Sequence, residues 1–508
     1  MLPRLSALLF ALLLFGCADV QSAKILTITA IASPSHGIWN RALVEALADK
    51  GHDVTMLTPF PMKNRTGVSY HDLGGLYEED DFMDFAKMST KENVEAFWAF
   101  ADAINPEQAH SETAKRMLTD NNEKYDLVIF ETCMSEVFAA ILPKFNAPVV
   151  AINAYADGWW NWELMGVDNR PSIFPGPIFP YKYPMTFMQR VANFLTNYYD
   201  KYCRKNYIRA QQGLAKTVFG KQAAQIDEVE QNYDFFLVNN GPPGVDLGRA
   251  LPPNFKEVGC LQCRPADPSK LQKEVKEFLD GATEGFIFFS LGSNVKSSSL
   301  PDEMKKGILE VFGSLKLRVL WKFEVDDLPG KPKNVMINKW LSQQDVLGHK
   351  NIKIFITHGG RLSTQEANYH GVPLVVVPVF ADQHKNGEHA VTTGVGVKLE
   401  FLKFEKGKFA KCIQEVLKNP VYLKNAQKYS AIARDTMHTP LEEAVFWVEY
   451  VIRHKGAKHL RPAGQHLNWI QLHSIDVIAF LLLPVVFVLF VLKKLIGSFS
   501  KKDKVKRS

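Results

Sequence analysis

Short apolar runs alternate with amphipathic segments along the first half of this chain. Residues 23–37 (AKILTITAIASPSHG) open with a run rich in β-branched residues that ends in a turn. Residues 40–57 then show apolar positions at helical spacing, a glycine stop and a second apolar run, which predicts a strand–loop–helix–strand unit. The runs 125–130 (YDLVIF) and 147–152 (APVVAI) are almost continuously apolar, as strands of a parallel sheet covered on both faces are.

The second half of the chain repeats this alternation. Between the halves, residues 241–284 begin with a stretch rich in proline and glycine and are predicted to form an interdomain connection. The pattern therefore predicts an α/β protein with two doubly wound domains, residues 23–240 and 285–460, that face a cleft. The apolar runs that predict the second set of strands are 285–293, 318–323, 334–340, 352–360 and 372–378.

Both ends of the chain carry apolar runs with basic neighbours. Residues 1–22 combine Arg4, an apolar stretch and small residues, which is typical of a secretory signal peptide, with a lipoprotein cleavage site at Cys17 as the second interpretation. Residues 475–492 are predicted to form a transmembrane helix, although the run is short for a span. Lys493 and Lys494 close that run, so the basic tail 493–508 is expected in the cytosol and the body in a lumen.

The charge of the chain is concentrated in that tail. The formal net charge is +6, and residues 493–508 hold seven basic residues and one acidic residue, which accounts for the whole excess. A formally neutral body gives no electrostatic reason to expect nucleic acid as a partner. Lys504 and Lys506 near the end resemble a dilysine retrieval signal of type I proteins of the endoplasmic reticulum.

The cysteines and one asparagine bear on the compartment. Cys260 and Cys263 (CLQC) are expected to form a local disulfide or to remain two free thiols, because no second CxxC completes a zinc site. Asn64 begins the sequon NRT, which fits a glycoprotein with a luminal body.

Residues 355–366 (FITHGGRLSTQE) join a predicted strand to a helix expected to begin at about Ser363. Glycines there let the backbone approach an anion, and a helix N-terminus carries partial positive charge. Glu366, one turn into the helix, suits a pair of ribose hydroxyls or caps the helix with Ser363. No metal site is expected, because the histidines around His358 lack the i, i+4 spacing of a zinc motif.

Three other strand ends carry polar or aromatic residues. Ser293 (SLGS) lies among small residues that admit an anion or make an ordinary tight turn. Trp340 and Gln343 (WLSQ) could stack on a base and read its edge, with burial of the indole in the core as the alternative. Asp382 and Gln383 combine a carboxylate with an amide, which suits neighbouring sugar hydroxyls.

In this order and spacing, WLSQ, THGG, S-x-x-E, GVP and DQ resemble the signature of the UDP-glycosyltransferase family, which has the GT-B fold. The motifs cover about residues 290–391, and the anchored layout resembles the animal branch. Arg361-Leu362 departs from the plant relatives, which carry Trp-Asn at a phosphate contact. The resemblance implies donor contacts to uracil from Trp340 and Gln343, to the diphosphate from Ser293, His358, Gly360 and Ser363, to the ribose from Glu366, and to the sugar from Asp382 and Gln383.

The resemblance also implies the catalytic residues. His36, in SPSHG after the first strand, matches the family's catalytic histidine and would take the proton of an acceptor hydroxyl in a single inverting displacement. This needs no cofactor, because the UDP-sugar is a co-substrate. The acid that orients the histidine corresponds to Glu131, with Glu136 as the alternative. The aromatic stretch 155–162, with Phe174 and Phe179, either lines an acceptor pocket or packs in the core.

We therefore expect a membrane enzyme of the endoplasmic reticulum that transfers a hexose to small lipophilic acceptors, as in detoxification. Glucose is favoured over glucuronate as the sugar. The alternatives are a non-catalytic lipid-binding homologue and transfer to protein or lipid headgroups. A homo-oligomer is compatible with the sequence.

Overall fold

The computed structural model describes residues 22–75, 84–120, 122–156, 158–167, 169–241, 248–465 and 467–505. The chain divides into two compact units, a body up to Leu460 and a C-terminal unit from Arg461. The predicted signal peptide lies outside the described residues except for residue 22, and so do the last three residues of the predicted tail.

The first sheet of the body has seven strands, all paired in parallel, in the order β3-β2-β1-β4-β5-β6-β7. The strands expected after residues 23, 125 and 147 are present. The segment expected as the interdomain connection contributes the edge strand β7. The strands are β1 (Lys24–Ile28), β2 (Asp53–Thr58), β3 (Val68–Asp72), β4 (Leu127–Glu131), β5 (Val149–Asn153), β6 (Phe235–Val238) and β7 (Phe255–Glu257).

The second sheet has six parallel strands in the order β10-β9-β8-β11-β12-β13. The five apolar runs predicted as strands all form strands here. The central residues of β8, β9, β11 and β12 are buried, as expected for a sheet covered on both faces, whereas in the edge strand β10 only Val335 is buried. The strands are β8 (Phe286–Ser290), β9 (Arg318–Lys322), β10 (Val335–Asn338), β11 (Ile352–Thr357), β12 (Leu374–Val376) and β13 (Gly396–Lys398).

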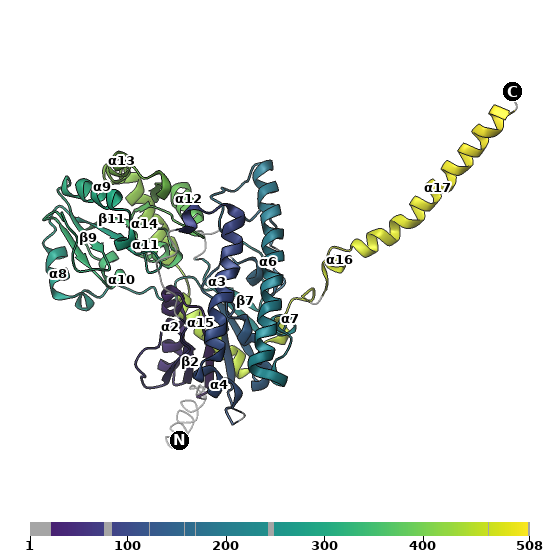
Figure 1. Cartoon of the computed structure of the whole chain (residues 1–508), viewed down its shortest axis with the longest axis horizontal. Helices are drawn as coiled ribbons and strands as arrows, with labels where there is room; N and C mark the ends of the chain where they lie inside the picture. Colours follow the sequence, from purple (N-terminus) through teal and green to yellow (C-terminus); the bar gives the residue numbers. More distant parts are fainter. Residues whose placement is uncertain are drawn as a thin grey trace, which may run out of the picture. The chain divides into compact units, whose positions relative to one another are not determined.

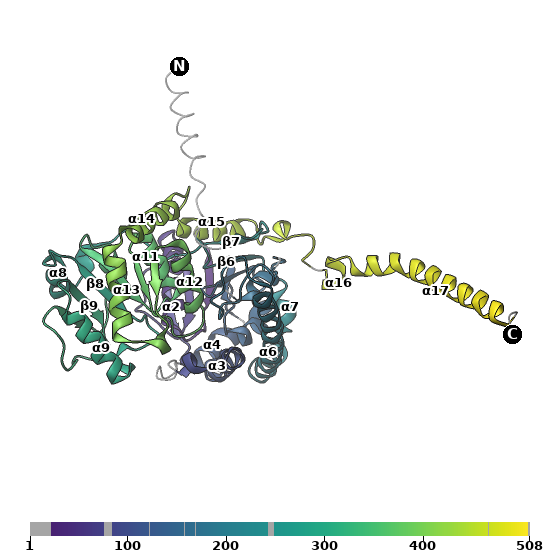
Figure 2. The ribbon, with the colours of Figure 1, turned by 90° about the horizontal axis from the view of Figure 1, so that it is seen from above.

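Helices cover both faces of each sheet (Figures 1 and 2). Those of the first domain are α2 (Pro34–Asp49), α3 (Thr90–His110), α4 (Glu112–Thr119), the 3-10 segment η2 (Glu136–Phe145), α5 (Trp159–Glu163), α6 (Phe187–Phe219) and α7 (Ile226–Glu230). The helices that follow later in the body are α8 (Lys273–Asp280), α9 (Asp302–Gly313), α10 (Gln343–Leu347), α11 (Arg361–His370), α12 (Gln383–Thr393), α13 (Lys406–Lys418), α14 (Pro420–Arg434) and α15 (Pro440–Arg453).

Helix α15 returns from the second domain to the first. Its buried Val445 and Val448 belong to the same hydrophobic cluster as Trp39 and Leu43 of α2. Trp447 stacks on Phe235 of β6 with ring centroids 4.8 Å apart. The end of the body therefore packs on the first domain and ties the two domains together.

The C-terminal unit contains α16 (Trp469–Leu472) and α17 (Ile475–Val505). Within α17, residues Ile475–Leu495 have a mean hydropathy of 3.0 and are long and apolar enough to cross a membrane. This stretch includes the whole of the run 475–492 that the sequence predicted as a span.

Candidate active site

A cleft of about 780 Å³ lies in the body and is lined by residues of both domains. The C-terminal ends of parallel strands form such clefts in doubly wound proteins. All the site residues predicted from the sequence line this cleft except Glu131, which lies behind His36.

His36 lies in the first turn of α2 and not in the preceding turn, because the helix begins at Pro34. Its Nδ1 lies 2.5 Å from Oε1 of Glu131, the last residue of β4. A carboxylate oxygen accepts, so Nδ1 carries the proton and the Nε2 lone pair remains available. Glu131 is fully buried, and its Oε2 accepts from Asn40 Nδ2 at 2.5 Å. Both oxygens of the Glu131 carboxylate are therefore hydrogen-bonded, one to His36 and the other to Asn40.

Asn40 was missed by the sequence interpretation. It lies four residues after His36 on α2, so both side chains share one face of the helix. That spacing was the signal that could have identified it.

Glu136, the alternative partner of His36, lies in a different environment. It is fully buried in η2, where Tyr207 donates to its Oε2 at 2.7 Å and Arg204 approaches its Oε1 at 3.6 Å. Arg204 is also paired with buried Glu230. Glu136 therefore belongs to a buried structural network with Arg204 and Tyr207, and Glu131 is the acid beside His36.

His358 directly follows β11, and its imidazole lies against Gly292 and Gly360. A Cβ added at Gly292 or at Gly360 would overlap that ring. Both positions therefore need glycine for the ring to lie there. Burial, with a smaller effect of the Lys322 ammonium, lowers the pKa of His358 to about 3, so the ring is neutral and binds as a hydrogen-bonding group rather than as a cation.

Lys322, at the end of β9, was also missed by the sequence interpretation. Its side chain is 14% exposed, and its Nζ donates to Gly292 O at 2.9 Å and lies 3.1 Å from Glu324 Oε1. The ammonium lines the cleft with Gly292 and Ser293. A basic residue closing an otherwise apolar strand run was the available signal.

Glu366 is buried in α11, which begins at Arg361, two residues before the expected start. Gln343 Nε2 donates to its Oε2 at 2.8 Å and to Ser363 Oγ at 3.0 Å. Gln262 Nε2 donates to its other oxygen at 3.2 Å. Burial raises the pKa of Glu366 to about 7, and the hydrogen bonds from the two amides oppose that rise. Two of the predicted donor residues, Gln343 and Ser363, are therefore joined to Glu366.

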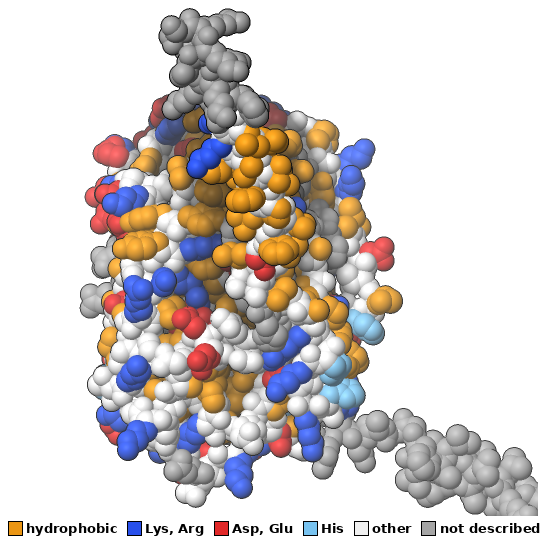
Figure 3. Space-filling view, turned by 90° about the vertical axis from the view of Figure 1, so that its right-hand side faces the viewer, with side chains coloured by type: hydrophobic (Ala, Val, Ile, Leu, Met, Phe, Trp, Pro, Cys, Tyr) orange, Lys and Arg blue, Asp and Glu red, His pale blue; other side chains and the backbone are white. Residues whose placement is uncertain are grey.

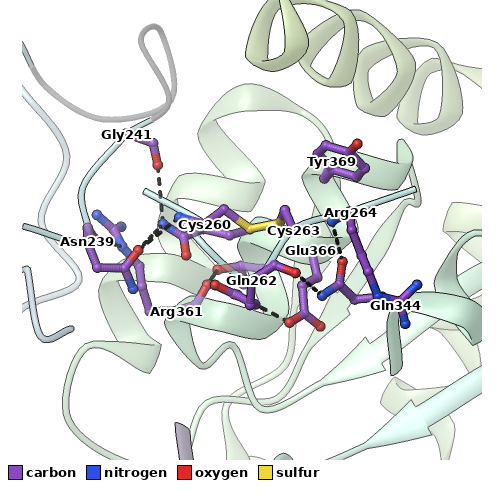
Figure 4. The surroundings of a disulfide bond; sticks show 12 residues. Asn239, Gly241, Cys260, Gln262, Cys263, Arg264, Gln344, Arg361, Glu366 and Tyr369 are labelled. Carbon is purple, nitrogen blue, oxygen red and sulfur yellow. Dashed lines mark hydrogen bonds between the residues drawn. A yellow bond between two sulfur atoms is a disulfide. The ribbon is translucent and has the colours of Figure 1, made fainter. Parts of the chain in front are cut away.

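Gln262 comes from a short loop closed by a disulfide between Cys260 and Cys263 (Figure 4). Of the two alternatives left open for these cysteines, the structure has the disulfide. Gln344 Nε2 donates to Gln262 O, and Gln344 Oε1 accepts from Arg264 N at 2.9 Å. The loop therefore orients the Gln262 amide toward Glu366.

Arg361 extends toward the first domain, where it donates to Asn240 Oδ1 and, at 3.4 Å, to Asn239 O (Figure 4). The arginine at this position therefore joins the two domains.

The remaining predicted donor residues differ in exposure. Trp340 is 59% exposed at the cleft, so burial in the core is excluded and the indole face is accessible. Gln383 Oε1 accepts from the backbone N–H groups of Val379 and Phe380 at 2.9 and 3.1 Å. Asp382 Oδ2 accepts from Asn386 at 2.7 Å. The Gln383 side chain is thus held by the loop before α12, and the Asp382 side chain is held by α12 itself.

The aromatic stretch divides between the two alternatives offered for it. Tyr155, Trp159 and Phe174 line the cleft, together with Phe97 of α3. Trp162 is buried and packs on Phe255 with ring centroids 5.0 Å apart. Phe179 is also buried in the body. The cleft therefore has an aromatic wall in the first domain, opposite the polar cradle of the second.

Comparisons with known proteins identify the family of the chain. A family model described as "UDP-glucoronosyl and UDP-glucosyl transferase" matches residues 23–507. The chain is 33% identical to "UDP-glucosyltransferase 2" of Dactylopius coccus, over 94% of this chain and 95% of that protein. It is 32% identical to "UDP-glucuronosyltransferase 2B33" of Macaca mulatta, over 91% of each.

Two solved structures resemble the whole fold. They are the spinosyn forosaminyltransferase SpnP, with a TM-score of 0.56 and 15% identity over 85% of this chain, and a glycotransferase of kitacinnamycin, with a TM-score of 0.54 and 16% identity over 86% of it. Both matches cover 100% of the solved chain. They confirm the GT-B fold expected from the sequence.

Proposed function

Because the chain belongs to the UDP-glucuronosyl and UDP-glucosyl transferase family and is a UDP-glycosyltransferase, we propose that it transfers glucose to a hydroxyl group of small lipophilic acceptors, with inversion. The observation that carries the proposal is the position of His36 and Glu131 in one domain, at the same cleft as the Glu366 cradle of the other. The aromatic wall supports a lipophilic acceptor.

In the proposed reaction, His36 Nε2 removes the proton of the acceptor hydroxyl while that oxygen attacks the anomeric carbon. The bond from this carbon to the β-phosphate oxygen breaks as the new bond forms, and UDP leaves with the electron pair. Glu131 stabilises the imidazolium that results, through the hydrogen bond at Nδ1. The Lys322 ammonium and the N-terminus of α11 oppose the charge that develops on the diphosphate.

Glucose is proposed as the sugar from the name of one relative. Asp382 and Gln383 offer a carboxylate and an amide to sugar hydroxyls that glucose and glucuronate share, so they do not decide between the two sugars. A relative with 33% identity is named a glucosyltransferase. Glucuronate is the competing sugar, since another relative is named a glucuronosyltransferase.

We propose a luminal body anchored in the endoplasmic reticulum membrane by α17, with a cleaved signal peptide and a role in detoxification. The apolar stretch Ile475–Leu495 and the exposed Asn64 of the glycosylation sequon support this topology. A glycosidase-sensitive mass shift that Asn64→Gln abolishes is expected, and an unchanged mass would contradict the luminal placement.

The activity is tested by turnover of the full chain with UDP-glucose and UDP-glucuronate against a set of phenols, steroids and polyketides. We expect a higher kcat/KM for UDP-glucose and loss of turnover in His36→Ala with UDP binding retained. Turnover that is unchanged in His36→Ala would overturn the assignment of the base.

A further inference from the structure

The N-terminal half of α6 exposes an unusual set of large apolar side chains. Its residues 187–202 leave six such side chains between 47 and 69% exposed to solvent. We name this set the α6 stripe: Phe187, Met188, Phe194, Leu195, Tyr198 and Tyr202. Steps of seven and four residues relate its members, so they lie on one side of the helix.

The stripe continues into basic residues. Lys205 and Arg209 follow Tyr202 at three and seven residues, on the same side of α6, and both are exposed. The order along this side is therefore Phe, Met and Leu first, then tyrosines, then Lys and Arg. A helix that enters a membrane interface has this order, because tyrosine prefers the headgroup level and basic side chains reach the phosphates.

Charge along the whole helix favours an anionic surface. Helix α6 holds six basic residues and one acidic residue, Asp200, a net charge of +5. Asp200 is turned inward, where it accepts from the indole N–H groups of Trp98 and Trp159 at 2.6 and 2.8 Å. Figure 3 looks onto the side of the molecule where α6 lies and shows Lys and Arg side chains spread over it.

The opposite side of the same helix lines the cleft, through Asn193, Thr196, Asn197 and Asp200. Helix α6 thus separates the acceptor wall from the α6 stripe. A surface in contact with a bilayer at this position would place lipophilic acceptors dissolved in the membrane beside the aromatic wall.

We propose that the α6 stripe docks the body on the surface of the membrane that anchors the chain, and that acceptors reach the cleft from that membrane. The inference rests on the anchorage by α17 proposed above, because a tethered body meets its own bilayer at high effective concentration. A second copy of the chain is the other occupant considered. It fits less well, since two copies of a helix with a net charge of +5 would repel each other, whereas an anionic bilayer attracts that charge.

The test uses the full chain with Cys17 and the free cysteines of the described residues, Cys133, Cys203 and Cys412, replaced by serine. The protein is reconstituted in vesicles with and without phosphatidylserine. Nitroxide labels are placed at Leu195→Cys, at Met437→Cys as the exposed control and at Val486→Cys in α17. The measurement is the accessibility of each label to oxygen relative to a water-soluble nickel complex.

We expect the label at Leu195 to become accessible to oxygen and protected from nickel in vesicles, while the label at Met437 stays accessible to nickel. The effect should weaken without phosphatidylserine and in a Lys205→Glu, Arg209→Glu background. A label at Leu195 that behaves like the one at Met437 would overturn the docking. The label at Val486 reports separately whether the anchorage holds.

A kinetic arm measures the consequence for acceptors. The pair Phe194→Ser, Leu195→Ser should raise KM for a membrane-soluble acceptor several-fold in vesicles and leave KM for UDP-glucose and for a water-soluble acceptor unchanged. The matched control is Val421→Ser, Leu423→Ser on α14, whose side chains are similarly exposed. Equal changes in both pairs would contradict delivery from the membrane, and protection of the Leu195 label only in self-associated chains would assign the stripe to a second copy.

Discussion

His36 Nδ1 lies 2.5 Å from Glu131 Oε1, which joins the first turn of α2 to the end of β4. The two residues are far apart in the chain, and pairing of β1 with β4 brings them together. Replacing Glu131 by Gln keeps the shape but removes the charge that stabilises the imidazolium. We expect kcat to fall by about 10²–10⁴-fold, with little change in KM for the UDP-sugar.

The check on Glu131→Gln is steady-state kinetics across a range of pH, with UDP affinity measured in parallel. Glu136→Gln serves as the comparison, because that carboxyl lies in the network of Arg204 and away from His36. A larger loss of kcat in Glu136→Gln than in Glu131→Gln would contradict the assignment.

Gly360→Ala isolates the steric need for glycine beside His358. Gly360 has a φ of −59°, so alanine introduces no backbone strain, but its Cβ would overlap the imidazole. Displacing the ring should cost about 1–3 kcal/mol and raise the Kd for UDP about ten-fold or more. Calorimetric titration measures this. Gly407→Ala on α13 is the control, since nothing lies within 4 Å of its added Cβ, and an equal effect there would show that the clash is irrelevant.

The raised pKa of Glu366 predicts that binding of the UDP-sugar donor releases a proton. Burial raises the pKa of this carboxyl to about 7, and ribose hydroxyls that donate to the ionised carboxylate would lower that pKa. UDP-glucose, which has no ionisation of its own in this range, should therefore release a proton on binding and bind more tightly as pH rises from about 6 to 8. Titrations in buffers of different ionisation enthalpy count the proton.

The same shift has the opposite sign for folding. A carboxyl whose pKa is raised in the folded state binds its proton more tightly there, so its contribution to stability falls as pH rises from the ordinary 4.5 through about 7. In Glu366→Gln both pH dependences should disappear. Persistence of proton release in that variant would assign it to another group.

Lys322→Gln tests the partly buried ammonium at the proposed phosphate end of the cradle. Losing a charge-assisted hydrogen bond of about 1.5–3 kcal/mol should weaken UDP binding at least ten-fold. Uridine, which has no phosphate, should bind as before. Lys306→Gln on the exposed side of α9 is the matched control. Equal losses for UDP and uridine would point to a distorted site instead.

Substitution of Arg204 should lower the stability of the fold strongly. Arg204 is buried, with its Nη2 2.5 Å from Glu230 Oε1, and burial raises the pKa of Glu230 to about 7 despite this partner. Arg204→Met leaves Glu136 and Glu230 buried without a cation, which should cost about 3–5 kcal/mol and lower Tm. Thermal unfolding measures this, with exposed Arg209→Met as the control. Adding Glu136→Gln and Glu230→Gln to Arg204→Met should restore most of the lost stability. An Arg204→Met variant as stable as the unaltered protein would show that the network contributes little.

Much of the fold followed from local sequence. Continuous apolar runs can be buried on both faces only in a covered parallel sheet, so the strands of both domains were predictable where the runs were long. Strands β3, β6, β7 and β13, of three to five residues each, were not singled out, because segments this short carry little periodic signal. Likewise, residues 355–366 by themselves indicated a loop and helix able to bind an anion.

Long-range contacts decided the rest. Whether Glu131 or Glu136 faces His36 depends on how β4 lies against β1, and Asn40, Gln262 and Lys322 entered the site by the same packing of distant segments. The sequence by itself determined the elements, the motif residues and the apolar C-terminal run, because each depends on neighbours along the chain. Only the tertiary structure decided the partners of each side chain, the burial that shifts the pKa values of Glu366 and His358, and the exposure of the α6 stripe, because these depend on what packs against a residue from elsewhere.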